Sequence, residues 1–531
     1  DRDQLDAMYA GLLWNRTSGQ LVKLADNSGE KPIYQNAYGI SDPFYRAYCT
    51  SAAGILQHQS CAEPLHKQYD TSQTRGLLGW IQEGFGCVPA AAIYNCSGSR
   101  WSICPPLPLQ RGIEPDPRID FTKSPGRSRS RLFGYPKRTD GGRKLSTLSK
   151  LQHSLNQAVE TRLEADVPLG VFLSGGIDSG LISAIAKQHR PDIKTFTVRM
   201  PDARFDESEA AAETAKHLGT DHHTLDCDPN PADDLVHLIH QLGLPFGDSS
   251  LLPTYWVSKA AREHVKVALA GDGGDELFGG YRRHTIAPSL IRYRHLLRLI
   301  PTRLLNQRKP GSRGTYLARL VTAACAGGYP ELLAIFQTPD LRSLVTPNDG
   351  DRVGSTIFEK IADPLRYDFD HYLPNDLLRK TDTASMAVAL EVRAPFLARE
   401  LVEAALRTPL DVLMPGGERK GLLKQVARKY LPDHIVDRPK QGFAIPIGEW
   451  FRTDFGSMRT LLYDHLESTD PFPGLAEAGV NISMDFVRRM LREHDAAGER
   501  SLNPWHGRDH SQRLYMLLVL SIWSKWLQSI R

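Results

Sequence analysis

Two glycine-rich turns in this chain carry acidic residues at positions where they could bind a metal–phosphate group. The first is LSGGIDS, residues 173–179, which lies between an apolar run and a segment of helical periodicity. Its glycines allow a ligand to approach the backbone closely, and the following helix would present free N–H groups and a partial positive charge. The turn therefore predicts a phosphate-binding loop. It differs from the P-loop, because no lysine follows, and from the three-glycine dinucleotide pattern.

The carboxylate of Asp178 in this turn indicates a metal ion. It would repel a bare phosphate, so we expect a cation such as Mg²⁺ between the two groups. Taken alone, the turn could also be a strand–helix connection in which the glycines serve packing only.

The second turn is VALAGDGGDELFGGY, residues 267–281, in which Asp272, Asp275 and Glu276 follow another apolar run. The loops that follow parallel strands gather at one edge of the sheet, where ligands bind. We therefore expect both turns to hold the same Mg²⁺–phosphate group from two sides.

Helices alternate with short apolar strands around these turns, which predicts an α/β fold with a parallel sheet covered by helices on both faces. Beyond residue 285 the pattern is mostly helical. The helical segments are residues 145–164, 179–189 and 206–219, and the apolar strands are residues 169–174, 193–200 and 264–271.

Three regions differ in composition and indicate the domain organisation. Residues 1–110 hold short β-type runs broken by Gly, Asn and Ser, which predicts antiparallel β structure with a few helices. Residues 111–145 are basic and rich in Pro, Gly and Ser, and we expect a solvated linker there rather than a phosphate-binding site. Residues 146–531 form the α/β region.

Composition excludes several classes of protein. The net charge of +4 over 531 residues is too small to favour a nucleic-acid partner, and no apolar run is long enough to span a bilayer. Five of the seven cysteines lie in the first 104 residues without metal-ligand spacing. We expect reduced thiols in a cytoplasmic protein.

Several motifs occur in order and together resemble the synthetase domain of the glutamine-hydrolysing asparagine synthetases, from about residue 150 to 525. They are LSGGIDS, FDESEAA, LGTDHH, VALAGDGGDELFGGYRRH, LPNDLLRKTDTASMAVALEVRAPFL and RPKQGFAIPIGEWFR. The resemblance implies an ATP pyrophosphatase fold of the adenine nucleotide α-hydrolase type. It also implies that the side-chain carboxylate of aspartate becomes β-aspartyl-AMP with release of pyrophosphate. Ammonia, from glutamine or free ammonium, would then displace AMP to form asparagine.

The same resemblance implies roles for individual residues. The nucleotide, with its phosphates and adenosine, would contact Leu173, Ser174, Gly175, Gly176, Asp178, Ser179, Val198 and Gly271. Mg²⁺ would be bound by Asp178 and Asp275. The catalytic residues would be Asp272 beside the amine-attack step, Lys440 at the α-phosphate, and Glu391 as a buried acid with Arg393 and Lys380 as neighbours.

Other interpretations of some of these residues stay open. Glu391 could pair with Arg393 or Lys380 in a helical core, and Lys440 could be a surface lysine. His222 and His223 are adjacent on a strand, where their side chains point to opposite faces, so we expect them to be structural rather than metal ligands.

Residues 1–110 resemble part of a class II glutamine amidotransferase (Ntn) domain. LDAMYAGLLWN and VKLADNSGEKPIYQN carry this resemblance, and Asp6 would bind glutamine. No cysteine precedes Cys49, so we expect a truncated or degenerate domain that does not hydrolyse glutamine in this chain.

Three further functions are compatible with these residues. An adenylating synthetase that forms a lactam or another amide would share the nucleotide site and act on another carboxylate, as β-lactam synthetases and lasso-peptide cyclases do. An RNA-modifying ATP pyrophosphatase would use the basic linker to hold tRNA. A degenerate protein would bind ligands without catalysing a reaction. We expect small-molecule substrates (aspartate with glutamine or ammonia), no membrane partner and no nucleic acid, and a homodimer is left open.

Overall fold

The structure is a computed structural model. It describes residues 148–227, 229–302, 305, 307, 309, 311–347, 361–439, 444–499, 503 and 506–530, together with the backbone of five short strands nearer the N-terminus. Lys440, the linker of residues 111–145 and the five N-terminal cysteines lie outside the described side chains. Among the described residues, Cys227 and Cys325 carry thiols that form no disulfide.

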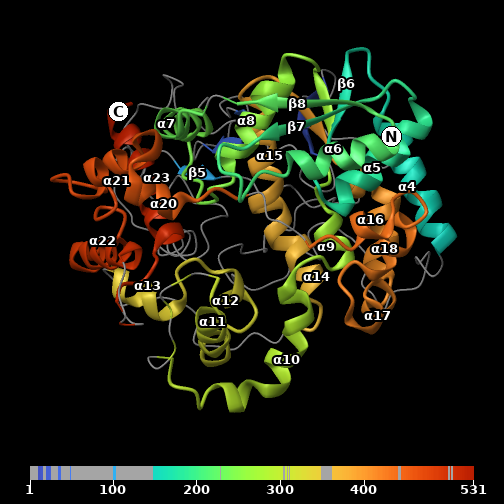
Figure 1. The fold of residues 1–531 in the computed structure, drawn as a ribbon. Helices are drawn as coiled ribbons and strands as arrows, with labels where there is room; N and C mark the ends of the chain where they lie inside the picture. Colours follow the sequence, from blue (N-terminus) through green and yellow to red (C-terminus); the bar gives the residue numbers. More distant parts are fainter. Residues whose placement is uncertain are drawn as a thin grey trace.

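A five-stranded parallel sheet lies in the middle of the α/β region, with strand order β11-β9-β6-β7-β8 (Figure 1). Its strands are β6 (Leu169–Phe172), β7 (Lys194–Arg199), β8 (Asp221–Asp226), β9 (Val267–Leu269) and β11 (Glu391–Arg393). Strand β6 pairs with both β7 and β9, so the loops after β6 and β9 are neighbours although they are far apart in sequence. This register places the two glycine-rich turns together.

Helices cover both faces of the sheet, because side chains alternate between the faces along each strand. Val171 and Leu269 pack with helices α4 (Leu148–Arg162) and α5 (Ile177–His189). Phe196 and Ala268 face the other side, where Ala261 of helix α8 packs against them. Helix α8 spans Leu251–Arg262 and helix α6 spans Ser208–Leu218. The predicted α/β class and the parallel sheet are confirmed.

The rest of the region is helical, as expected. In Figure 1, α10–α12 lie below the sheet, α16–α18 on the right and α20–α23 on the left. The helices are α7 (Pro231–Leu242), α9 (Gly274–Phe278), α10 (Arg282–Leu297), α11 (Arg313–Cys325), α12 (Pro330–Leu333), α13 (Thr338–Leu344), α14 (Pro364–Tyr367), α15 (Leu378–Met386), α16 (Arg399–Arg407), α17 (Leu410–Leu413), α18 (Gly421–Ala427), α19 (Asp433–Val436), α20 (Ile447–Thr453), α21 (Met458–Leu466), α22 (Met484–Gly498) and α23 (Ser511–Ser529). A π-helix covers Asp368–Leu377, and 3₁₀ turns cover Pro395–Leu397, Pro415–Gly417 and Phe455–Ser457.

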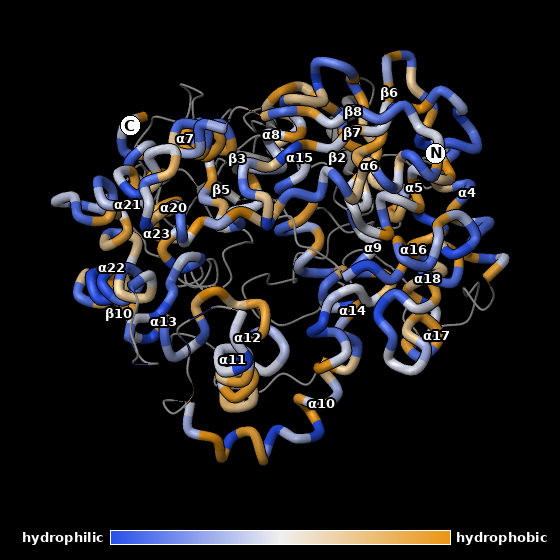
Figure 2. Tube along the Cα trace, viewed as in Figure 1, coloured by the Kyte–Doolittle hydropathy of each residue, from blue (hydrophilic) through white to orange (hydrophobic). Residues whose placement is uncertain are grey.

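The C-terminal helix α23 is the centre of a second core. Fifteen of its residues are buried, among them Tyr515 and Trp523, and the Trp523 indole donates a hydrogen bond of 2.9 Å to the Gly243 carbonyl. Helix α22 is amphipathic instead: Figure 2 shows it mainly in blue, and its few apolar residues are buried. A two-stranded antiparallel ribbon joins β10 (Val345–Pro347) to β12 (Val480–Ile482). None of the described helices is long and apolar enough to cross a membrane.

The five strands nearer the N-terminus pair antiparallel. Strand β1 (Ala10–Asn15) pairs with β2 (Gln20–Ala25). Strand β3 (Tyr34–Ala37) pairs with β4 (Tyr48–Cys49) and with β5 (Arg100–Ser102). Their side chains lie outside the described part, so the amidotransferase resemblance and Asp6 stay predictions.

The segment around Glu391 is not helical. One interpretation left open placed Glu391 in a helical core, but residues 391–393 form β11, the edge strand of the sheet, paired in parallel with β9. A run of three residues is too short for periodicity to distinguish a strand from a helix.

We predict that Gly170→Ala destabilises the sheet. A Cβ atom at Gly170 would lie 2.4 Å from the ring of Phe196 on β7, and that ring is fully buried between the sheet and α8. Overpacking of this kind costs about 1–3 kcal/mol. The urea midpoint should fall accordingly, whereas Gly311→Ala, which meets no atom within 4 Å, should leave it unchanged. Equal midpoints for both variants would contradict the close packing of β6 against β7.

Candidate active site

The two glycine-rich turns meet at the carboxyl edge of the sheet. A Cβ atom on Gly271 would lie 3.0 Å from the Asp178 Cβ, and one on Gly274 would lie 2.8 Å from Asp178 Oδ1. Asp178 stands in the first turn of α5, and both glycines follow β9. Only residues without a side chain allow the second loop to approach the Asp178 side chain this closely.

The first turn is shaped by its two serines. The Ser174 backbone N–H donates to Ser179 Oγ at 3.0 Å, and the Gly176 N–H donates to Ser174 Oγ at 3.2 Å. Gly176 is the N-cap of α5 and provides no side-chain cap. The first N–H groups of α5 are therefore not satisfied by a capping side chain, which is the arrangement that binds anions at helix N-termini.

Lys420 joins the two acidic turns. Its Nζ lies 2.5 Å from Asp178 Oδ2 and 2.7 Å from Asp275 Oδ1, and the residue is only 6% exposed. Burial would lower the pKa of Lys420, but the two carboxylates outweigh burial and hold that pKa above its usual value. The ammonium group is therefore charged and neutralises one of the two acids.

The backbone around Lys420 is adapted to this contact. Lys420 has a left-handed φ of 56°, which is uncommon for a residue with a side chain. A Cβ atom on Gly280 would lie 2.5 Å from the Lys420 Cε and 1.6 Å from Asp275 Oδ1, so Gly280 leaves room for both groups. Sequence reasoning missed Lys420, because no local motif marks a residue 242 positions from Asp178.

The acidic pair suits Mg²⁺. Asp178 and Asp275 already direct oxygens at one cationic point, and Mg²⁺ in proteins is commonly held by one or two carboxylates with substrate phosphates completing its coordination. Among the residues that the structure describes, no group of three or more His, Cys, Asp or Glu side chains could hold a metal ion. His222 instead contacts the Thr195 hydroxyl at 3.0 Å, as expected for a structural histidine.

Two cavities open at this edge. The sheet-edge cavity, of about 730 Å³, is lined by most of the predicted residues and by an apolar wall: Phe172, Leu173, Ser174, Asp178, Ser179, Phe196, Val198, Met200, Val257, Gly271, Asp272 and Asp275. The glycine-loop cavity, of about 710 Å³, has Gly175, Gly176, Lys420, Lys424 and Arg438 in its wall and shares Ser174 and Asp178. Each volume is in the range of small-molecule sites.

Asp272 faces a lysine in the sheet-edge cavity. The Lys380 Nζ lies 3.0 Å from Asp248 Oδ2 and 2.8 Å from Ser250 Oγ, and its charge also acts on Asp272. Burial raises the pKa of Asp272, and Lys380 offsets only part of that effect. Thr381 Oγ1 donates a hydrogen bond to Asp272 Oδ2 at 3.4 Å.

Glu391 does not lie at the carboxyl edge of the sheet with the two turns. It is the first residue of β11, at the amino end of a strand, whereas the two turns follow the carboxyl ends of β6 and β9. Its side chain is 41% exposed and accepts a hydrogen bond of 2.7 Å from Arg393 Nε. The expected buried position is wrong, and the pairing with Arg393 agrees with the open structural interpretation.

Most of this chain is similar to a known family of proteins. Residues 150–528 match the asparagine synthase family. Asparagine synthetase 1 (glutamine-hydrolyzing) of Bacillus subtilis (strain 168) is 27% identical over 541 residues, which cover 98% of this chain and 77% of the relative. A putative asparagine synthetase (glutamine-hydrolyzing) of Mycobacterium tuberculosis (strain ATCC 25618 / H37Rv) is 30% identical over 70% of this chain and 56% of its own length.

A third relative is asparagine synthetase B (glutamine-hydrolyzing) of Escherichia coli (strain K12), which is 33% identical over 72% of this chain and 61% of its own length. The family match covers the sheet, both acidic turns and the helices that carry Lys380 and Lys420. This chain therefore belongs to the asparagine synthase family and is a ligase of the asparagine synthetase type.

Proposed function

We propose that the chain is an ATP-dependent amide ligase that activates the side-chain carboxylate of aspartate as β-aspartyl-AMP and converts it to asparagine. The observation that carries the proposal is the convergence of Asp178 and Asp275 on one cationic point beside the N-terminus of α5. Family membership supports the use of ATP. The names of the relatives support aspartate as the acceptor.

In this proposal the nucleotide spans the two cavities. The adenosine lies against Leu173 and Val198, and the phosphates meet the N–H groups of the first turn, with Gly271 alongside. Mg²⁺, held by Asp178 and Asp275, would neutralise phosphate charge. Lys420 then has a phosphate oxygen as an alternative partner, since its ammonium group already lies where the negative charge would gather.

The chemistry consists of two displacements. A carboxylate oxygen of the acceptor attacks the α-phosphorus of ATP, and the bond to the β-phosphate oxygen breaks to release pyrophosphate. Ammonia next attacks the acyl carbon, the C–O bond to AMP breaks, and a proton leaves the nitrogen. Asp272 is the proposed acceptor of that proton, because its half-buried carboxylate has a raised pKa and lines the same cavity. Lys440 stays the proposed partner of the α-phosphate.

We also propose the division into an amidotransferase-like region (1–110), a linker (111–145) and the synthetase region (146–531). Either glutamine or free ammonium would supply the nitrogen. The described residues favour no lactam-forming or RNA-modifying alternative.

The proposal predicts that Asp178→Asn abolishes the first displacement. Pyrophosphate and asparagine should form from ATP, Mg²⁺, L-aspartate and ammonium with the wild-type chain, and the variant should lose at least about 100-fold in rate with its metal ligand. Asp226→Asn, an exposed aspartate paired with Arg199, is the matched control and should keep full activity. Wild-type chain that forms no aspartate-dependent pyrophosphate would overturn aspartate as the acceptor.

A second prediction concerns Lys420→Met. Without the ammonium group, two mostly buried carboxylates face each other, so we expect a loss of about 3–5 kcal/mol of stability in the absence of metal. Mg²⁺ should restore part of the melting temperature, because it binds between the same carboxylates in the folded state only. Lys424→Met, which removes two surface ion pairs, with Glu418 and Asp437, should change stability by less than about 1 kcal/mol and show no such response. A Lys420→Met variant that is insensitive to Mg²⁺ would contradict the shared cation position.

A third prediction concerns pH. Burial raises the pKa of Asp272, so its basic form is lost as the pH falls through a value above the usual aspartate range. Amide formation with hydroxylamine, which is uncharged at neutral pH, should therefore fall with decreasing pH at that value. Asp272→Asn should reduce the rate by about 100-fold or more and remove this ionisation from the profile. A variant that keeps the wild-type profile would exclude Asp272 as the proton acceptor.

A further inference from the structure

A third cavity adjoins the sheet-edge cavity within the described part of the chain. This arginine cavity has a volume of about 330 Å³ and shares three lining residues with the sheet-edge cavity, namely Asp248, Tyr372 and Gln512. Because the same side chains border both spaces, the two cavities are neighbours. The nucleotide and metal groups proposed above leave it unused.

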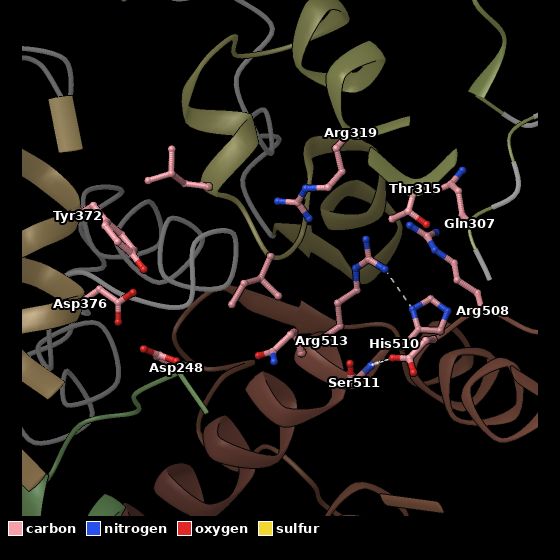
Figure 3. Close-up of a pocket in the computed structure, with 15 residues that line it drawn as sticks. Asp248, Gln307, Thr315, Arg319, Tyr372, Asp376, Arg508, His510, Ser511 and Arg513 are labelled. Atoms are coloured by element: carbon pink, nitrogen blue, oxygen red, sulfur yellow. Dashed lines mark hydrogen bonds between the residues drawn. The ribbon is translucent and has the colours of Figure 1, made fainter. Parts of the chain in front are cut away.

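The two ends of the arginine cavity differ in charge. Figure 3 shows Asp248 and Asp376 on one side with Tyr372, and the guanidinium groups on the opposite side. The guanidinium groups are those of Arg319, Arg508 and Arg513. They come from α11 and from the segment at the start of α23, so the tertiary fold alone brings them together.

The arginine end carries a surplus of positive charge. Asp340 accepts from both Arg508 and Arg513, at 3.4 and 2.7 Å, and Glu331 is the carboxylate that acts most strongly on Arg319. Three guanidinium groups thus face two carboxylates. Neighbouring charges do not remove the surplus: Glu493 faces Arg489 as well as His510, and Asp509 pairs with Arg452. Burial holds the pKa of His510 down at about 4, so this histidine is neutral.

One N–H group of Arg513 lacks an acceptor. The residue is only 8% exposed, and its Nε–H has no hydrogen-bond partner, although one terminal nitrogen contacts His510 Nδ1 at 3.2 Å. Burial lowers the pKa of Arg513 to about 10 in spite of Asp340. A buried donor without a partner is costly, and a carboxylate with two oxygens suits a guanidinium fork.

The acidic end suits a hydrogen-bond donor rather than a second anion. Asp376 is buried and its Oδ1 has no hydrogen-bond partner. Burial together with Asp248 raises the pKa of Asp376 to about 8. An ammonium group beside it would donate to this oxygen and add to the positive charge that Lys380 already supplies.

We propose that the arginine cavity binds the end of the acceptor substrate that does not react, with its free carboxylate on Arg508 and Arg513 and its amino group facing Asp376. For aspartate, the acceptor in the proposed function, one carboxylate would be activated in the sheet-edge cavity and the other recognised here. The assignment rests on the proposed function for the position of the reacting carboxylate.

The test is ATP–pyrophosphate exchange by the wild-type chain and by Arg508→Met, whose side chain is 27% exposed and therefore tolerant of replacement. L-Aspartate is compared with β-alanine, which is aspartate without the α-carboxylate. We expect KM for L-aspartate to rise roughly 10- to 100-fold in the variant, the effect of one charge-assisted hydrogen bond, with kcat and KM for ATP unchanged. Exchange with β-alanine should be equally weak in both proteins.

The matched control is Arg459→Met, which removes an arginine paired with Asp495 at 2.8 Å outside the three cavities. It should leave KM for L-aspartate unchanged. An unchanged KM in Arg508→Met, or an equal loss with L-aspartate and β-alanine, would overturn the subsite while the proposed function stands.

Binding is measured separately, by calorimetric titration of L-aspartate and succinate in the presence of Mg²⁺ and a non-hydrolysable ATP analogue. Wild-type binding that weakens at least tenfold in Arg508→Met supports the subsite even if no exchange occurs, in which case only aspartate activation fails. Wild-type chain that binds neither dicarboxylate overturns the proposal.

Discussion

The sharing of one cation by Asp178 and Asp275 is the constraint on which the rest of this site depends. Both side chains are mostly buried, so neither carboxylate can rely on water for its solvation. Two such charges are compatible with a folded state only when a positive group lies between them, and Lys420 provides it. The glycines around this ion pair follow from the same constraint, because a Cβ atom on Gly274 or Gly280 would enter the space that the charged groups occupy.

The strand order allows this arrangement and the helices complete it. Strands β6 and β9 are neighbours in the sheet, which brings the first turn of α5 beside α9, the short helix that carries Asp275. Lys420 comes from the loop before α18, and its backbone N–H donates to the Phe278 carbonyl at the end of α9 at 3.2 Å. One backbone hydrogen bond and two ion-pair contacts therefore fix the lysine with respect to both acidic turns. In the proposed function, these contacts would prepare the site in advance for a metal–phosphate group.

Local sequence patterns predicted the part of this arrangement that depends on local rules. The apolar runs, the helical periodicity and the edge rule for parallel sheets sufficed to bring Asp178, Asp272 and Asp275 together. Lys420 and Lys380 escaped prediction as partners of these acids because long-range contacts leave no local pattern. Glu391 was misplaced for another reason: three residues can form an edge strand without any periodic signal, and its acidic side chain then lies at the solvated amino end of that strand.

The continuous lining of the three cavities alternates acids with bases, and this alternation explains how one surface can bind several charged groups. Lys420 lies between Asp178 and Asp275, Lys380 contacts Asp248, and Asp340 lies between Arg508 and Arg513. Lys420, Lys380 and Asp340 each have an internal partner of opposite sign, whereas the arginine end keeps one guanidinium group in excess. A carboxylate or phosphate of a ligand could take the place of an internal carboxylate beside a lysine or arginine, so that the cation would keep a partner of opposite charge. Recognition then becomes an exchange of partners, and its selectivity comes from the fixed positions of the side chains rather than from net charge.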